Sequence, residues 1–264
     1  MIKSFYSLLL ALVSASAFSQ AFITTWNTAN PGTSANNVLT IPTNPAYTNY
    51  NYTVDWGDGT TTSNATGNRA HTYAAPGVYT VSITGTFPAI FFNNMGDRRK
   101  ITSILSWGAI QWQSMEDAFY GCENLNFDAI DSPNLAQVTS LKNMFRDCTS
   151  FNGILNNWNV STITNISGIF AKAEIFNRPL DNWNTINVTN MSETFKNCLT
   201  YNEPLDNWNT ASVTNMKGMF SACLNFNQNI NSWDVSQVTN MSEMFSACRS
   251  FNQPLNIWNV SEVT

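Results

Sequence analysis

Residues 226–250 read FNQNINSWDVSQVTNMSEMFSACRS, and variants of this pattern recur along most of the chain. One tryptophan position and two other aromatic positions repeat with a period of about 25 residues. Their members are Trp158, Trp183, Trp208, Trp233 and Trp258; Phe145, Phe170, Phe195, Phe220 and Phe245; and Phe151, Phe176, Tyr201, Phe226 and Phe251. Several independent series with one period indicate a repeat architecture. We count six complete units, starting near residues 101, 125, 151, 176, 201 and 226, and a partial seventh.

The pattern inside each unit predicts its local structure. The apolar residues of 238–248 recur at i, i+3, i+6, i+7 and i+10, which is one face of a short helix or 3₁₀ turn. Residues 251–256 (FNQPLN) are short and bounded by turn residues, so we expect one strand per unit. A single unit buries too little apolar surface to offset the ordering of its backbone, so the units must stack. Residues 93–264 are therefore expected to form an α/β solenoid with a parallel sheet.

Asparagine and cysteine follow the same period. Of the 38 asparagines, one follows the aromatic residue of every unit (Asn152, Asn177, Asn202, Asn227 and Asn252). An amide can satisfy backbone groups at tight corners and can bond to its stacked copies; carbohydrate binding by Asn and Trp is the alternative. Cys122, Cys148, Cys198, Cys223 and Cys248 share one slot with Ala173. That substitution favours small buried thiols, and oxidation of neighbours such as Cys198 and Cys223 is the other possibility.

The first twenty residues have the pattern of a secretory signal peptide. Lys3 precedes an apolar run from Phe5 to Ala17, which ends in the small-residue pattern of Ala15 to Ala17. A buried N-terminal helix is the alternative. The run is too short to span a bilayer, and no later segment approaches 18 consecutive apolar residues. We therefore expect an exported protein, extracellular or on the outer cell surface, without a membrane span.

Residues 21–92 predict a small β-sandwich. Residues 50–56 and 78–84 alternate β-branched or aromatic residues with polar ones, and turn sequences such as Gly57-Asp58-Gly59 separate the predicted strands. The motif VDWGDGT at 54–60, followed by HTY at 71–73 and PGVYTV at 76–81, resembles the polycystic-kidney-disease (PKD) domain signature. This resemblance implies an immunoglobulin-like fold. The linker at 87–100 is short and rich in Phe, so we expect the sandwich to abut the first repeat.

The repeat resembles that of the BspA-like leucine-rich-repeat surface proteins, with its closest match at residues 233–252 (WDVSQVTNMSEMFSACRSFN). The resemblance implies a solenoid that is displayed on a bacterial surface and engaged in adhesion or host-protein binding. Residue 264 falls inside a unit, without a capping segment. We therefore expect the chain to be a fragment of a longer protein or the product of a truncated gene model.

Candidate residues for chemistry are few. The chain has one histidine, His71, and no nucleophile motif accompanies it. His71 beside Asp55 or Asp58 would be a base or metal ligand, but a structural role next to the turn is favoured. Asp55 and Asp58 are weak Ca²⁺ candidates, and turn capping by Asp58 is the preferred interpretation. We predict no enzyme activity, no cofactor and no other metal site.

The amino-acid composition limits the classes of molecule that the chain is expected to bind. Lys and Arg total 12 against 17 Asp and Glu, and no basic cluster occurs, so nucleic acid is excluded as a partner. Within the repeats, Arg178, Glu203, Gln228 and Gln253 share one slot that varies while the core slots do not. These residues are the candidate binding face for an extracellular protein or glycan; unconstrained surface positions would look the same. The alternatives are a purely structural spacer, and an accessory region of a secreted hydrolase whose catalytic domain lies beyond residue 264.

Overall fold

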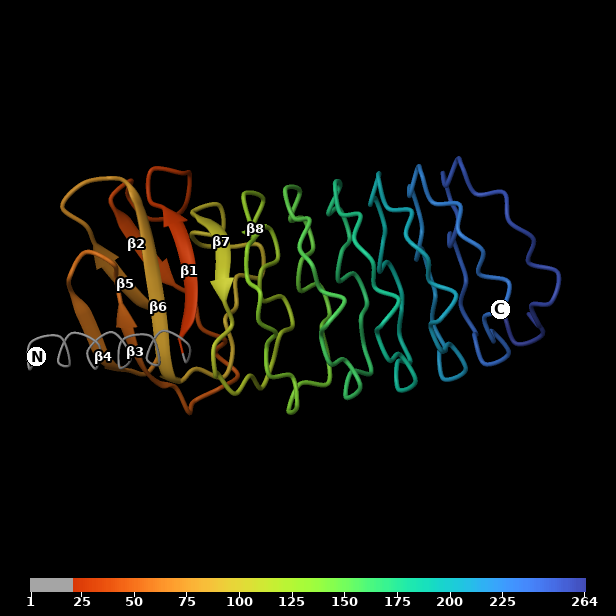
Figure 1. Ribbon diagram of the computed structural model, residues 1–264, viewed down its shortest axis with the longest axis horizontal. Helices are drawn as coiled ribbons and strands as arrows, with labels where there is room; N and C mark the ends of the chain where they lie inside the picture. The colour runs from red at the N-terminus through yellow and green to blue at the C-terminus, as the bar shows by residue number, and fades with distance from the viewer. Residues whose placement is uncertain (1–20) are drawn as a thin grey trace, which may run out of the picture.

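A computed structural model describes residues 21–264 (Figure 1). The predicted signal peptide at 1–20 lies outside the described residues. The described chain contains eight β-strands and no helix. Two small sheets are formed mainly by residues 21–106, and the rest winds into a column of stacked turns that ends at the C-terminal residue (Figure 1). Equivalent positions of successive turns, such as Asn177 and Asn202, are 25 residues apart, and we call each turn a coil.

The strands form a six-stranded and a two-stranded sheet. Their bounds are β1 Phe22–Asn27, β2 Val38–Ile41, β3 Asn51–Asp55, β4 Thr61–Ala65, β5 Arg69–Thr72, β6 Val78–Thr86, β7 Ile101–Ser106 and β8 Asn126–Phe127. The larger sheet has the order β4-β3-β6-β1-β7-β8, and β2 pairs with β5 in the smaller one. All pairs are antiparallel except β7 with β8. The larger sheet is therefore mixed.

Alternation of side chains explains why these segments are strands. In β1 the residues alternate between buried and half-buried, with Phe22 and Trp26 inside. The indole of Trp26 donates to the Thr24 hydroxyl at 2.8 Å, so its polar atom is satisfied within the core. Every second residue of β3 is buried as well, and its Val54 is fully enclosed.

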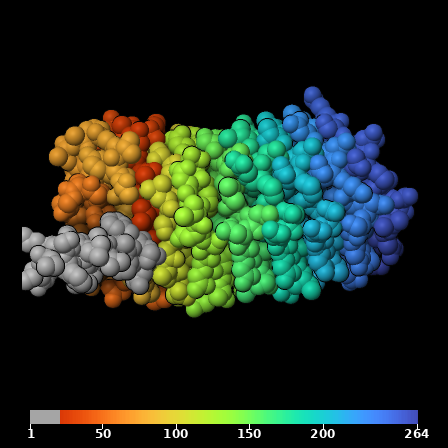
Figure 2. Space-filling view, viewed as in Figure 1, coloured from red at the N-terminus to blue at the C-terminus, as the bar shows by residue number. Residues whose placement is uncertain are grey.

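The large sheet continues into the first coils. β7 belongs to the first repeat unit, and it pairs with β1 on one side and with β8 of the next coil on the other. Next to it, the backbone N–H groups of Phe92, Asn93 and Asn94 donate to carbonyls of residues 117–120. One cluster of buried side chains runs from Phe22 to Met244 without a break. On the face seen in Figure 2, the two regions likewise form one continuous surface.

Within the column, equivalent side chains stack on one another. The Phe145, Phe170, Phe195, Phe220 and Phe245 rings follow each other at centroid distances between 5.6 and 6.2 Å. Each indole of the later coils donates to a carbonyl of the coil before it, as Trp208 does to Leu180 at 2.9 Å. Because the period is constant, each residue packs against the equivalent residue of the next coil, as the aromatic series predicts.

The expected helix does not form. In residues 191–198, the amides of Thr194, Lys196 and Cys198 each donate to the carbonyl three residues earlier, which makes a chain of overlapping turns. Glu193 and Asn197 have positive φ (55° and 59°), which no right-handed helix contains. The N–H groups between these turns donate to the next coil instead: those of residues 191, 193, 195 and 197 bond the carbonyls of 215, 217, 219 and 221. The apolar spacing fits this chain of turns as well as it fits a helix.

The expected strand does not form either. In three of the units, the segment after the aromatic residue contains proline (Pro179, Pro204 and Pro254), which has no N–H to donate to a ladder. Beyond β7 and β8, pairing of the β type between successive coils is limited to isolated parallel bridges, such as that of Asn190 with Asn215. The predicted parallel sheet is thus reduced to β7 with β8 and isolated bridges.

The predicted fold class, an immunoglobulin-like sandwich followed by an α/β leucine-rich-repeat-like solenoid, is therefore wrong. The described chain has no helix, and its six-stranded sheet is built from both predicted parts. Hydrophobic spacing specified which residues are buried, but it did not determine where the backbone N–H groups bond.

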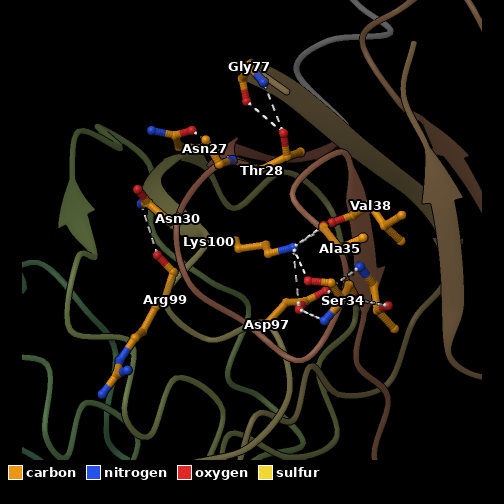
Figure 3. A network of polar contacts seen from close by, with 12 residues as sticks. Asn27, Thr28, Asn30, Ser34, Ala35, Val38, Gly77, Asp97, Arg99 and Lys100 are labelled. Atoms are coloured by element: carbon orange, nitrogen blue, oxygen red, sulfur yellow. Dashed lines mark hydrogen bonds and ion pairs between the residues drawn. The ribbon is translucent and has the colours of Figure 1, made fainter. Parts of the chain in front are cut away.

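A buried ion pair ties the loop before β2 to the segment before β7 (Figure 3). The Lys100 ammonium donates to the carbonyls of Ser34, Ala35 and Val38 at 2.7–3.1 Å. The Asp97 carboxylate lies 3.7 Å from Lys100 Nζ, and both side chains are 0% exposed. Asp97 accepts from the amides of Ser34 and Thr40 and from the Ser34 hydroxyl. Both charges are thus fully compensated, which is the condition for burying them.

We expect Lys100→Met to lower the free energy of unfolding by about 3–5 kcal/mol, because it leaves Asp97 as an uncompensated buried charge. The matched control is Lys172→Met, since Lys172 pairs with Asp147 at 3.3 Å but is 53% exposed. Such a surface pair contributes about 0–1 kcal/mol. Urea unfolding followed by tryptophan fluorescence measures both variants. Equal, small effects would contradict a structural role for the buried pair.

A second prediction concerns the residues with positive φ in the turn chain. Gly218 has a φ of 59°, and an added Cβ would have no contact closer than 3.7 Å, so Gly218→Ala tests conformation alone. We expect it to lower stability by about 1–2 kcal/mol, and Glu243→Gly at the same slot (φ 59°) to raise stability by a similar amount. The control is Gly67→Ala, where φ is not positive and space is open. Thermal unfolding measures the variants. Equal melting temperatures for Gly218→Ala and the control would contradict the left-handed conformation at this position.

Candidate binding surfaces

The predicted binding face lies on an asparagine ladder. Each Asn that follows the aromatic residue accepts, through Oδ1, the backbone N–H of its copy in the next coil. The bonds run from Asn177 to Asn152, Asn202 to Asn177, Asn227 to Asn202 and Asn252 to Asn227, at 2.8–3.0 Å. In this part of the coil, a side-chain amide takes the place of a backbone carbonyl, because the coils are not paired as strands here.

The variable residues follow directly after this ladder. Arg178 is exposed, and Glu203, Gln228 and Gln253 are half-buried. Three of them also bond to the preceding coil: Arg178 Nε donates to the Asn152 carbonyl at 3.1 Å, Gln228 Nε2 to the Asn202 carbonyl at 2.8 Å, and Gln253 Nε2 to Asn227 Oδ1 at 3.1 Å. The structure therefore places the four predicted residues in adjacent coils and orders three of the side chains. We call them the variable row.

A second line of exposed residues accompanies the variable row. The next slot holds Ile154, Pro179, Pro204, Asn229 and Pro254, and all five are exposed, so Asn229 interrupts a line that is otherwise apolar. The prolines present apolar rings without an N–H group, so this edge of the column offers no row of free donors for strand addition. The variable row thus combines one cation, one anion and two amides beside an apolar ridge.

Two further asparagine series cap turns. Asn190 accepts the N–H of Ser192 at 3.0 Å, and Asn209 accepts that of Ala211 at 3.1 Å; equivalent residues in other coils do the same. This i to i+2 bond is the Asx turn, which suits Asn and Asp. The periodic asparagines therefore act in the frame of the column. Carbohydrate binding by them stays an untested alternative.

The threonine that precedes Asn190 belongs to another regular series. The Thr189 and Thr214 hydroxyls each donate to the carbonyl of the threonine one coil earlier, at 3.2 and 3.3 Å. The backbone N–H of each threonine donates to the same carbonyl. This exposed series has its polar atoms engaged in joining coils.

The structure brings His71 and Asp58 together and leaves Asp55 apart. His71 Nε2 lies 2.7 Å from Asp58 Oδ2, and the His71 ring stacks on Trp56 with centroids 4.8 Å apart. Asp58 Oδ1 accepts from the hydroxyl and N–H of Thr60, and these bonds, followed by that to His71, lower the pKa of Asp58 to about 2. Asp55 accepts the N–H of Gly57 at 2.9 Å. Both aspartates therefore cap the turn between β3 and β4.

Within residues 21–264, no group of three or more His, Cys, Asp or Glu side chains is arranged to hold a metal ion. Of the two weak Ca²⁺ candidates, Asp55 bonds its own turn, and Asp58 bonds its own turn through Oδ1 and His71 through Oδ2. Their residue types suit a hard cation, but the observed bonds are those of turn capping.

Two features of the structure have no counterpart in the sequence reasoning. One is the Asp97–Lys100 pair. The other is a cavity of about 740 Å³, lined by residues drawn from the segments 33–50, 66–68 and 91–97, among them Tyr47, Asn68 and Met95. Its walls come from three separate segments, so no local motif marks it. The Phe-rich linker was the only available signal, because Phe91 and Phe92 both line the cavity.

The periodic cysteines are free thiols. Four are buried, and Cys248 is half-buried. The sulfurs of the last four donate to carbonyls of the preceding coil, as Cys198 does to Phe170 at 2.9 Å. Desolvation raises the pKa of the buried thiols, so few are ionised at neutral pH. Desolvation also raises the pKa of Cys248, to about 11.

The fold and the variable row define a repeat protein built from stacked coils, with polar side chains displayed on a uniform frame. The family model described as "Mycoplasma protein of unknown function, DUF285" matches residues 113–211 and 179–264. Together these matches cover more than half of the 264 residues, and the chain belongs to this family. No curated protein and no solved structure matches the chain.

These findings correct the resemblance to BspA-like leucine-rich-repeat proteins with an N-terminal PKD-like domain. The family match is to DUF285, not to a leucine-rich-repeat family, and it begins only at residue 113. The turn chain also lacks the helix that the resemblance implied. Among the described residues, no helix is long and apolar enough to cross a membrane.

Thiol reactivity tests the arrangement of the coils. We expect one of the five cysteines, Cys248, to react rapidly with Ellman's reagent in the full chain, because the other four are buried. Its rate should rise roughly tenfold per pH unit between pH 7 and 9, since a thiol with a pKa near 11 gains thiolate throughout that range. Cys248→Ser should remove the fast phase, and Cys122→Ser should leave it intact. A plateau below pH 9, or several fast thiols, would contradict this arrangement.

Proposed function

We propose that this is an exported, non-catalytic protein that binds an extracellular protein through the variable row. The observation that supports this is the contrast between neighbouring slots. The ladder asparagine is the same in five successive coils, whereas the next slot contains Arg178, Glu203, Gln228 and Gln253 in the last four of them. Variation on a rigid frame is what a specific protein interface requires.

The chemistry of the variable row suits a protein partner. Arg178 bonds the frame through Nε, and Glu203 in the next coil has no hydrogen-bond partner among residues 21–264. A cation and an anion in adjacent coils favour a partner surface with the opposite order of charges. The exposed rings of Pro179 and Pro204 add apolar area beside them. The partner surface would therefore pair charges with the row and pack on the ridge.

The surroundings of His71 support a non-catalytic role. Its ring stacks on Trp56 and its Nε2 is bonded to Asp58, which also bonds Thr60. An accessory role in a secreted hydrolase is the competing proposal. That alternative predicts turnover by the full chain that His71→Ala abolishes, and an absence of such turnover agrees with a binding protein.

The test exchanges the two charges of the variable row. We expect the full chain to bind at least one of fibrinogen, fibronectin and collagen, each immobilised separately for surface plasmon resonance. The double variant Arg178→Glu with Glu203→Arg should weaken that binding by roughly tenfold or more, because it sets like charges against each other. The effect should shrink at high salt, where exposed charges are screened.

The control is Lys142→Glu, an exposed residue of the turn chain rather than of the variable row. It should leave binding within about twofold, because a charge away from the interface has little influence on affinity. Thermal unfolding should be equal for the three proteins, since none of the changed side chains is buried. No binding to any of the three matrix proteins, or binding that the charge exchange leaves unchanged, would refute the proposal.

A further inference from the structure

The cavity beside β2 is separate from the variable row, because no residue of the row lines it. Its volume of about 740 Å³ falls in the range of small-molecule sites. Its walls are formed by the loop after β2, the turn between β4 and β5, and the linker before β7. The Asp97–Lys100 network (Figure 3) ties β2 and the loop before it to this linker, and its Thr40 and Asp97 also line the cavity.

The walls are rigid on two sides. Tyr50 is 3% exposed, and its hydroxyl donates to the Ala89 carbonyl at 2.7 Å while it accepts the Asn44 N–H at 2.8 Å. At the residue before Asn44, the N–H and the hydroxyl of Thr43 donate to Asn68 Oδ1, at 2.7 and 2.8 Å, which joins this loop to the turn between β4 and β5. A cavity whose walls are held by hydrogen bonds is preformed, which reduces the entropy lost when a ligand binds.

The cavity has no charge to offer a ligand. Asp97 is the one acidic residue in the lining, and no Lys, Arg or His of the described chain lines it. The Asp97 carboxylate is already bonded to two backbone N–H groups and one hydroxyl, and it lies 3.7 Å from Lys100. Phosphates, carboxylates and amines would therefore be desolvated without a counter-ion, which is costly. A neutral ligand fits best.

The lining alternates apolar faces with unused hydrogen-bonding groups. Tyr47, Phe91 and Met95 supply apolar surface, and Met95 is 59% exposed. The amide nitrogens of Asn44 and Asn68 and the hydroxyls of Thr33 and Thr66 have no hydrogen-bond partner among residues 21–264. Two amide donors and two hydroxyls, which donate and accept, thus border an aromatic surface.

We propose that this cavity binds a short neutral carbohydrate. A sugar ring has C–H faces that pack on aromatic side chains and hydroxyl groups that both donate and accept, so it uses both kinds of lining. A proline-rich peptide would use the aromatic surface but offers few groups that bond the four polar side chains, so it would gain fewer hydrogen bonds than a sugar. The carbohydrate is therefore the better match. This inference does not rest on the proposed function of the variable row.

The experiment is saturation-transfer NMR on the full chain. The probes are maltotriose, cellotriose and triacetylchitotriose at millimolar concentration, with a capped hexaproline peptide and trigalacturonate as comparison ligands. We expect saturation transfer to at least one neutral trisaccharide and none to trigalacturonate. Titration of the trisaccharide that responds then gives its Kd.

Two variants assign the binding to the cavity. Gly67 lines it and a Cβ there meets nothing within 4 Å, so Gly67→Trp should place an indole in the space without backbone strain and abolish the transfer. Asn68→Asp keeps the acceptor for Thr43 but loses the amide donor, and should raise Kd by roughly two- to tenfold. The matched control is the Arg178→Glu, Glu203→Arg variant, which should bind the sugar as the unaltered chain does.

Each outcome decides the proposal. The proposal is supported if saturation is transferred to a neutral trisaccharide, if Gly67→Trp abolishes this transfer, and if the charge-exchange variant retains it. Transfer to none of the three sugars, or transfer that both cavity variants leave unchanged, would overturn it. Transfer to hexaproline alone would also overturn it and would indicate a peptide site. Failure in any of these ways leaves matrix-protein binding by the variable row unaffected.

Discussion

The column depends on backbone hydrogen bonds that join each coil to the next. In one coil the N–H groups of residues 191, 193, 195 and 197 all donate in the same direction, to carbonyls of the following coil, and that coil repeats the pattern from residue 216 onwards. These groups have no partner within their own coil, so the spacing between coils is constrained to one value. Aromatic rings of the same slot must then stack, and a change in coil length would break both sets of contacts.

This constraint explains which sequence-based predictions succeed. The constant period and the identity of the buried slots follow from side chains that stack on themselves, and both are visible as series of Trp and Phe. The predictions of a helix and a strand in each unit are wrong because apolar spacing indicates which residues are buried. It does not indicate which group each backbone N–H bonds. Gly168 and Gly218 hint at left-handed positions, but Glu193 and Glu243 occupy the same slot with no such signal.

The candidate sites also include one that the sequence predicted and others that it did not. The variable row was found because a repeat aligns equivalent positions, so variation at one slot stands out against a uniform background. The bonds from Arg178 and Gln228 to the preceding coil were not foreseen, since they depend on how close the coils approach. The cavity and the network around Lys100 were missed because their members are distant in sequence; Ser34 and Lys100, for example, are 66 residues apart. Periodicity carries no information about such contacts.

The low charge of the chain follows from this construction. Most polar positions in a coil must bond a neighbouring coil or their own turn at a fixed distance, and a neutral amide does both without like-charge repulsion between stacked copies. Asn202 bonds both Asn177 and Asn227, whereas identical charged residues at that slot would repel each other along the column. Charged residues are therefore few in the column, and most of them lie in slots where consecutive coils differ; Asp181 and Asp206, which share one slot, are an exception. The variable row, with Arg178 beside Glu203, is such a slot, and opposite charges in neighbouring coils avoid the repulsion that identical charges would produce there.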